Sequence, residues 1–363
     1  YYNANGQLLK GWQNIKDTSV TPNVTRTYYF DPITGELQTG FKTIANKTYY
    51  LNNQCSASIP EYGARATNAR VPVGEGMYSF DTAGVMQKGF FKIKEANETV
   101  ARLRYFSLKD GKEYSVDSLE VERLGFNNYS NANVVSVLDV GMGSRAYFYL
   151  NNTSPRKGYQ NVVYKNNDTD ANVTLRQYFD TTTGILQTGL FKAGADVVCA
   201  DQATGEIYNS TLTGNGPKQI TTEMWESAGI NKPEGYYFFN SDGKMMTGWI
   251  SWNKNRYYFS PVDGHMYTGS RMIGNVGYYF NEAPATSERP YGAMSVNDWM
   301  QKDYDPTEGD DFRNAYYYNA NGQLLKGWQN IKDTTVIPNV TRTYYFDPIT
   351  GELQTGFKTI ANM

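Results

Sequence analysis

Short stretches in which hydrophobic and polar residues alternate recur along this chain of 363 residues. In residues 36–41, for example, Leu37 and Phe41 alternate with the polar Glu36 and Gln38. Successive side chains of a strand point to opposite faces, so a period of two is typical of a strand with one buried face. The pattern predicts many short strands. One short helix is expected to begin near Thr221, because threonine is a favourable N-cap residue.

The aromatic tripeptide Tyr-Tyr-Phe recurs every 21 residues, at 236–238, 257–259 and 278–280. After each tripeptide we expect a turn and then a second strand. The turns include Asn240–Gly243, Pro261–Gly264, Asp31–Gly35 and Asp180–Gly184, and each ends in a Gly that can adopt a positive φ. The second strand ends in Gly and an aromatic or apolar residue, at Gly11-Trp12, Gly40-Phe41, Gly89-Phe90, Gly158-Tyr159, Gly189-Leu190, Gly248-Trp249 and Gly327-Trp328. These features predict β-hairpins.

A two-stranded hairpin is marginally stable in water, so each module must bury its aromatic face against a neighbour. We therefore expect an all-β fold, a solenoid of stacked short hairpins. Irregular insertions are expected at 53–76, 108–146, 193–234 and 281–315. Hairpin modules of roughly 20–30 residues include 1–27, 28–48, 236–256 and 257–277.

A second, longer period is nearly perfect. Residues 1–46 recur as 317–362, and the copies differ only at Ser19 against Thr335 and Thr21 against Ile337. A shared core requires only similar patterning and volume, so near-identity indicates a recent duplication. We predict one complete unit over 1–316, the start of the next over 317–363, and an array that continues beyond this chain.

Composition narrows the choice of partners. The chain has 31 Tyr and 34 Gly, so aromatic side chains must supply much of the core. Its 34 basic and 36 acidic residues almost cancel, which argues against nucleic acid and anionic membranes as partners. No apolar run approaches the roughly 20 residues needed to span a bilayer, and no signal peptide is recognisable in a chain that begins at Tyr1.

Catalytic chemistry has little support in the sequence. The single histidine, His265, falls at a predicted hairpin turn. Patterns of serine proteases, zinc hydrolases and nucleotide-binding loops are absent. The acidic residues of 303–311 are out of register for a calcium-binding loop. We predict no enzyme activity, no cofactor and no metal site.

Two kinds of covalent feature are candidates. Cys55 and Cys199 are too few for a disulfide scaffold, and both a single disulfide and two buried thiols stay open. Ten Asn-x-Ser/Thr sequons are candidate N-glycosylation sites, at Asn23, Asn46, Asn97, Asn128, Asn151, Asn152, Asn167, Asn172, Asn209 and Asn339.

The segment 236–269, with its Tyr-Tyr-Phe, Asp-Gly and Thr-Gly-Trp elements, resembles the cell-wall-binding repeat family. That family includes choline-binding modules, glucan-binding regions of glucansucrases and the C-terminal repeats of large clostridial toxins. The resemblance implies a β-solenoid secreted by a Gram-positive-type bacterium, with ligands in slots between consecutive hairpins. In choline-binding members, one Trp follows Gly and a second immediately precedes the Tyr-Tyr pair.

This chain keeps Trp12, Trp249 and Trp328 in the first role and lacks the second Trp. Thr27, Thr48, Arg256, Gly277 and Thr343 stand in that place and offer no π face to a quaternary ammonium. Flat aromatic rings can instead stack on sugars. We expect the best sugar slot at Trp249, Trp252, Tyr257, Tyr258 and Tyr267, with Trp12, Tyr28 and Trp328 as further stacking residues.

Three functions follow from these features. The first is an extracellular, cell-surface region that binds carbohydrate or cell-wall glycan through many weak slots. The second is a structural filament without ligand, in which copies of the repeat serve cohesion or self-assembly. The third is the receptor-binding or glucan-binding tail of a toxin or a glucansucrase.

Overall fold

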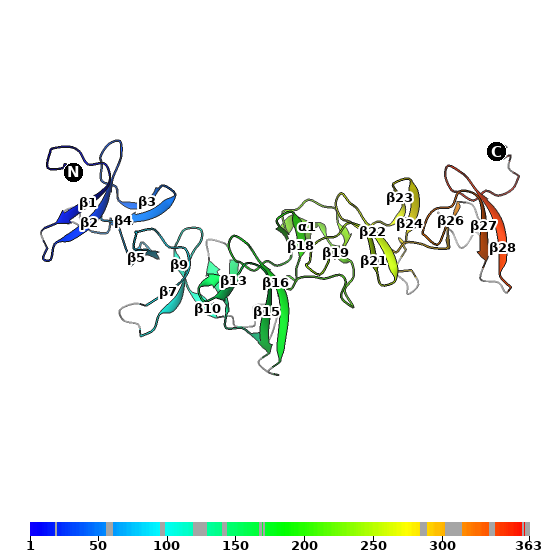
Figure 1. The fold of residues 1–363 in the computed structure, drawn as a ribbon, viewed down its shortest axis with the longest axis horizontal. Coiled ribbons are helices and arrows are strands. Elements are labelled where there is room, and N and C mark those ends of the chain that lie inside the picture. Colours follow the sequence, from blue (N-terminus) through cyan, green and yellow to red (C-terminus); the bar gives the residue numbers. More distant parts are fainter. Residues whose placement is uncertain are drawn as a thin grey trace. The chain divides into compact units, whose positions relative to one another are not determined.

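The computed structural model in Figure 1 describes most of the chain. The described residues are 1–18, 20–55, 61–94, 99–118, 129–139, 144–166, 169, 171–283, 289–301, 314–333, 338–357 and 359. The acidic stretch 303–311 lies outside them. Two compact units are present, Tyr1–Gln187 with Ala203–Glu206 and Thr188–Gln202 with Ile207–Met363. This division follows contacts, so it does not test the predicted 316-residue repeat.

Almost all regular structure is β-strand. The first unit contains β1 (Gly11–Asp17), β2 (Val24–Phe30), β3 (Gly40–Ile44), β4 (Lys47–Leu51), β5 (Ala69–Val73), β6 (Gly76–Phe80), β7 (Gly89–Ile93), β8 (Arg102–Phe106), β9 (Glu113–Tyr114), β10 (Val116–Ser118), β11 (Tyr129–Ser130), β12 (Val134–Asp139), β13 (Ser144–Asn151), β14 (Ser154–Pro155), β15 (Gly158–Asn166) and β16 (Asn172–Phe179). The second contains β17 (Leu190–Ala193), β18 (Asp196–Cys199), β19 (Lys218–Ile220), α1 (Thr222–Ser227), β20 (Gly235–Tyr237), β21 (Gly248–Trp252), β22 (Asn255–Phe259), β23 (Gly269–Ile273), β24 (Val276–Phe280), β25 (Asp298–Gln301), β26 (Ala315–Tyr318), β27 (Gly327–Asp333) and β28 (Val340–Phe346). The predicted all-β fold of hairpins is confirmed.

The predicted helix is also present. Thr221 is the N-cap of α1, and its side chain accepts a hydrogen bond from the backbone N–H of Met224. The insertion 108–146 is more regular than expected, because β10, β12, β13 and β14 form a four-stranded sheet.

The structure corrects the pairing within each hairpin. The main ladder joins the strand that begins with Gly to the following Tyr-Tyr-Phe strand, as in Trp249 opposite Tyr258. Asn253 and Lys254, with φ of 45° and 65°, close this ladder as a two-residue turn with the backbone twist that antiparallel strands favour. The predicted turn after Tyr-Tyr-Phe also forms, but only one bridge follows it, as in Phe259 with Met266.

The residue that follows the glycine turn also bonds to the preceding hairpin. The backbone N–H of Met266 donates to the carbonyl oxygen of Tyr236 at 2.8 Å, so Met266 joins its own hairpin to the preceding strand. The same link recurs from Met294 to Arg256 and from Leu324 to Gly277, both within the second unit. Hairpins therefore stack through the residue that follows each glycine turn.

Successive turns are also joined by a contact between an apolar side chain and a glycine. A Cβ atom added to Gly35 would lie 2.4 Å from Leu8, and one added to Gly351 would lie 2.6 Å from Leu324. In each case the apolar side chain comes from one turn and the glycine from the next. We call this contact the glycine seat.

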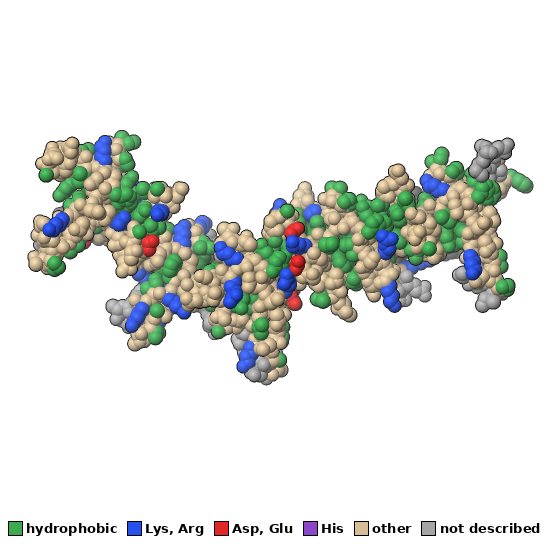
Figure 2. Space-filling model, in the orientation of Figure 1, with side chains coloured by type: hydrophobic (Ala, Val, Ile, Leu, Met, Phe, Trp, Pro, Cys, Tyr) green, Lys and Arg blue, Asp and Glu red, His purple; other side chains and the backbone are tan. Residues whose placement is uncertain are grey.

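Small cores lie between neighbouring hairpins. One contains Phe238, Tyr257, Phe259, Met266 and Ala293, and Ile250 and Trp252 pack against it. Aromatic rings dominate it, as the composition predicted. On the face shown in Figure 2, Lys and Arg side chains occur at several separate places, without the single basic patch that a polyanion would favour.

Candidate functional site

The predicted slot at Trp249 is divided between the two faces of one hairpin. Trp249 lies opposite Tyr258, and Ile250 lies opposite Tyr257. Trp252 stands three residues after Trp249, so its side chain points to the other face of the strand.

Tyr257 and Trp252 are therefore part of the core. Tyr257 is only 1% exposed. Trp252 packs so closely on Gly216 that a Cβ added there would lie 2.6 Å from the indole. The prediction that these two residues join Trp249 in one slot is wrong.

On the opposite face, Trp249 sits between two hairpins. Its ring centroid lies 5.0 Å from that of Tyr258 in its own hairpin and 4.9 Å from that of Tyr278 in the next, both edge-on. Tyr267 packs on Tyr258 at 5.2 Å and borders the same face. Trp249, Tyr258 and Tyr267 are all partly exposed. Together they form what we call the Trp249 slot.

The same three-ring arrangement recurs at other hairpins. Trp12 lies 4.8 Å from Tyr29 and 4.9 Å from Tyr49. Trp299 lies 5.0 Å from Tyr317 and 5.1 Å from Tyr344.

Trp299 was missed in the sequence. Asp298 precedes it, whereas the predicted stacking residues Trp12, Trp249 and Trp328 all follow Gly; Trp299 and Tyr317 nevertheless occupy the same ladder positions as Trp249 and Tyr258.

Arginine side chains cover two of the three tryptophans. The guanidinium carbon of Arg256 lies 4.4 Å from the ring centroid of Trp249, and that of Arg65 lies 5.1 Å from the centroid of Trp12. A cation over an indole face is attracted by the negative face of the π system. At these two indoles the chain's own guanidinium groups therefore already make a cation–π contact.

The remaining predicted stacking residues differ in accessibility. Tyr28 is only 8% exposed, so its ring belongs to the core. Trp328 is 55% exposed and packs on Tyr345 at 4.8 Å. Trp328 can therefore present a ring face, and Tyr28 cannot.

The single histidine, His265, lies beside a carboxylate. It lies in the predicted turn, and its Nδ1 is 2.7 Å from Oδ1 of Asp263. Across the described residues, no three or more His, Cys, Asp or Glu side chains come close enough together to hold a metal ion. None of the helices in the described part of the chain has the length and apolar character to cross a bilayer.

Both cysteines are free thiols, so the disulfide alternative is not formed. Burial raises the pKa of the Cys199 thiol to about 12, and Cys199 packs in a hydrophobic core. Cys55 is half-buried. Of the two buried thiols that the sequence left open, only Cys199 is fully buried.

Seven of the ten sequons lie in the described residues. Asn97, Asn128 and Asn167 lie outside the described residues. The exposed ones are Asn23, Asn46, Asn151, Asn152, Asn172 and Asn339. Oδ1 of the half-buried Asn209 accepts hydrogen bonds from the backbone and hydroxyl groups of Thr211. Their glycosylation stays a prediction.

Comparison with known proteins places one segment clearly. The choline-binding repeat model matches residues 230–270, which include the Trp249 slot and Arg256. No curated protein matches the chain.

Solved structures from Streptococcus pneumoniae match this chain at low superposition scores. CbpJ from strain TIGR4 is 19% identical over 95% of this chain and 100% of its own, with a TM-score of 0.39. The choline binding domain of Spr1274 is 32% identical over 22% of this chain and 94% of its own, with a TM-score of 0.16. The modular autolysin LytC, in complex with a synthetic peptidoglycan ligand, is 14% identical over 88% of this chain and 53% of its own, with a TM-score of 0.33.

Proposed function

We propose that this chain serves as a non-catalytic, extracellular glycan-binding region. Its resemblance to the cell-wall-binding repeat family is confirmed over residues 230–270. It would belong to a bacterial surface or secreted protein. Its ligand would be cell-wall carbohydrate held in slots between consecutive hairpins. Many such slots along one chain would give avidity from individually weak contacts.

The cover of Arg256 over Trp249 carries this proposal. With Arg256 already over the indole, the slot offers a partly exposed indole, two tyrosine rings and a guanidinium group. Aromatic rings pack against the C–H groups of a sugar, and guanidinium N–H groups donate to its hydroxyl oxygens. This combination favours a neutral sugar over choline.

Replacing Trp249 by alanine tests the slot. We expect Trp249→Ala to weaken retention on insoluble Gram-positive cell walls by about 5- to 30-fold, the equivalent of roughly 1–2 kcal/mol for losing one aromatic anchor. Sedimentation of the chain with purified walls measures this.

Val262→Ala is the control, because Val262 is an apolar side chain that is 89% exposed in the turn Pro261–Gly264. Circular dichroism should show that both variants keep their fold. Equal retention of Trp249→Ala and wild type would contradict the proposed slot.

The role of Arg256 predicts a change of ligand preference. Removing its guanidinium uncovers the indole, so Arg256→Ala should bind choline about 5- to 30-fold more tightly than wild type, as expected for a cation–π contact of roughly 1–2 kcal/mol. The Nε1–H resonance of Trp249 in an NMR titration with choline chloride reports the binding. Arg256→Lys keeps a cation near the ring and should show no gain. Identical choline affinities in the two variants would show that the guanidinium of Arg256 does not keep choline from Trp249.

A structural role is the second candidate, and the repeated three-ring packing between hairpins favours it. In that case the rings serve cohesion within the chain alone. Trp249→Ala would then lower the melting temperature while leaving wall retention unchanged. The two measurements on one variant separate the candidates.

A further inference from the structure

The hairpin of β23 and β24 lacks the ring that other hairpins place between neighbours. Gly269 lies opposite Phe280 and Ser270 opposite Tyr279. In the preceding hairpin, Gly248 lies opposite Phe259 and Trp249 opposite Tyr258. Ser270 therefore holds the position of Trp249.

Register also identifies the two rings that a tryptophan at 270 would contact. Trp249 packs on its cross-strand Tyr258, and Trp299 packs on its cross-strand Tyr317. At Ser270 the cross-strand ring is Tyr279.

The second ring comes from the next hairpin. For Trp249 it is Tyr278, opposite Arg271, and for Trp299 it is Tyr344, opposite Gln329. The residue with the same register in the hairpin after Ser270 is Tyr316, opposite Met300.

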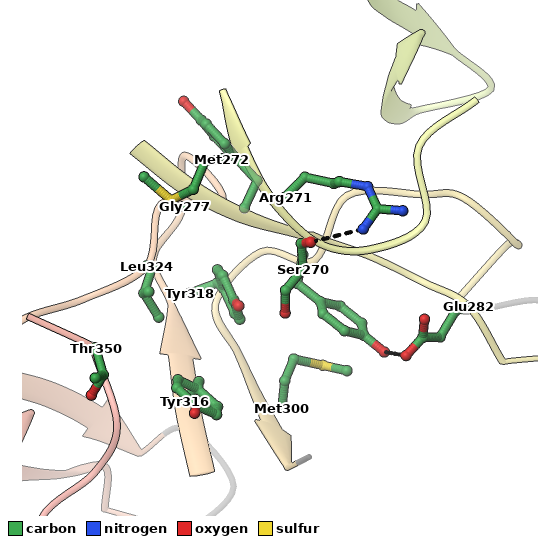
Figure 3. Close-up of a pocket in the computed structure, with 12 residues that line it drawn as sticks. Ser270, Arg271, Met272, Gly277, Glu282, Met300, Tyr316, Tyr318, Leu324 and Thr350 are labelled. Atoms are coloured by element: carbon green, nitrogen blue, oxygen red, sulfur yellow. Dashed lines mark hydrogen bonds between the residues drawn. The ribbon is translucent and has the colours of Figure 1, made fainter. Parts of the chain in front are cut away.

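A cavity lies where the missing indole would stand. Ser270, Tyr279, Tyr316 and Met300 line it, and its volume is about 530 Å³. Figure 3 shows Ser270, Met300 and Tyr316 around the opening, with Glu282 at one side. This volume lies within the range of about 300–1,000 Å³ that is usual for small-molecule sites. We call it the Ser270 pocket.

A second hairpin without an aromatic residue at this position shows a different solution. There Arg70 lies opposite Ser79, and its Nε is 2.5 Å from a carboxylate oxygen of Glu113. Glu113 also accepts from Arg104 at 3.1 Å. A charged network takes the place of the ring at Arg70, whereas the small side chain of Ser270 leaves a cavity.

The lining of the Ser270 pocket joins apolar walls to hydrogen-bonding groups. Tyr279, Tyr316 and Met300 provide rings and a thioether. Tyr279 Oη lies 3.4 Å from Oε1 of Glu282. Burial, reinforced by the charge of Glu282, raises the pKa of Tyr279 to about 12, so its hydroxyl remains a neutral donor at physiological pH. The pocket therefore suits a ligand with an apolar face and a polar edge.

The charges that line the pocket select a neutral ligand. Glu282 carries a carboxylate, which disfavours an anion, and Arg271, whose Nη1 donates to the carbonyl oxygen of Ser270 at 3.1 Å, carries a guanidinium, which disfavours a cation. Both groups form hydrogen bonds with hydroxyls: a carboxylate accepts from them and a guanidinium donates to them. A ring with apolar faces and several hydroxyl groups at its edge matches both the apolar walls and these hydrogen-bonding groups.

We propose that the Ser270 pocket binds one pyranose ring of a neutral oligosaccharide, which takes the place of the missing indole between Tyr279 and Tyr316. This proposal rests on the proposed glycan-binding function and adds a second kind of site to it. In the Trp249 slot a protein ring would stack on the sugar at the surface. In the Ser270 pocket the sugar ring itself would pack between two hairpins.

Refilling the pocket is the sharpest test. Isothermal titration of the full chain with an isomalto-oligosaccharide and with a peptidoglycan-derived tetrasaccharide should give saturable binding of at least one of them. Ser270→Trp should reduce that affinity more than tenfold, because the indole occupies the sugar's place. Its melting temperature should equal or exceed that of wild type, since a cavity is filled.

Two further variants guard against a trivial loss of fold. Ser270→Ala leaves the cavity open and should keep the affinity within about threefold, because one weak hydrogen bond is lost. Glu282→Gln keeps the shape of the rim and replaces a charged acceptor by a neutral one, so it should weaken binding by about threefold to tenfold.

The outcomes separate this inference from the proposed function. Equal oligosaccharide affinity of wild type and Ser270→Trp would overturn the Ser270 pocket. So would failure of both oligosaccharides to bind while cell walls still retain the chain through Trp249, and in that case the proposed function would stand. If cell walls did not retain wild type, but wild type bound an oligosaccharide and Ser270→Trp abolished that binding, wall binding would be refuted and the Ser270 pocket would stand. Choline binding that Ser270→Trp removes would contradict a neutral ligand.

Discussion

Trp225→Ala is expected to lower the free energy of unfolding of the second unit by about 3–5 kcal/mol, the usual cost of removing a large buried aromatic side chain. Trp225 is 1% exposed and packs edge-on against Tyr237 with ring centroids 4.9 Å apart. Its Nε1–H donates to the carbonyl oxygen of Pro233 at 3.1 Å. The alanine variant would lose both the packing and this hydrogen bond. Urea unfolding followed by circular dichroism measures the change.

Trp328→Ala is the matched control, since the same side chain is 55% exposed there. It should change stability by less than about 1 kcal/mol, as surface substitutions usually do. If the two variants unfolded at the same urea concentration, Trp225 could not be the centre of the core around α1.

A comparable loss is expected from a single methyl group at Gly243. This residue has a φ of 70°, and an added Cβ would lie 2.6 Å from Ile207 and 2.9 Å from the carbonyl oxygen of Cys199. The left-handed backbone costs a non-glycine residue roughly 1–2 kcal/mol, and overpacking adds roughly 1–3 kcal/mol. Gly243→Ala should therefore destabilise the second unit by about 2–5 kcal/mol in urea unfolding.

Gly248→Ala separates the two contributions. Its φ is 78°, but nothing lies within 4 Å of an added Cβ. Only the backbone cost of about 1–2 kcal/mol should then appear. Equal effects at the two glycines would show that the contact with Ile207 and Cys199 is not tight.

Local chemistry made the hairpins and the helix predictable. Glycine turns after Tyr-Tyr-Phe and the N-cap at Thr221 have short-range signatures that the structure confirms. The main ladder was assigned to the wrong turn because Asn253-Lys254 contains no glycine, although both residues adopt positive φ. A lysine in that conformation has no sequence signature, and the ladder that surrounds it holds it there.

The site was harder to predict because its contacts join distant residues. Strand parity would have separated Trp252 from Trp249 without a structure. The cover of Arg65 over Trp12 joins residues far apart in sequence, so no local pattern indicates it. The Ser270 pocket was invisible for another reason. It depends on a ring that is absent, and the absence has meaning only once the ladder register shows where the ring would stand.

The glycine seat bears on how such a chain can change length during evolution. Leu8 rests on Gly35 and Leu324 on Gly351, so the contact keeps the same phase in both copies of the duplicated segment. A recombination event that inserts or removes whole hairpins in this phase joins an apolar side chain to a glycine at the new boundary. An event out of phase would set that side chain against a residue with a Cβ. The fold therefore tolerates gain or loss of entire hairpins and selects against partial ones.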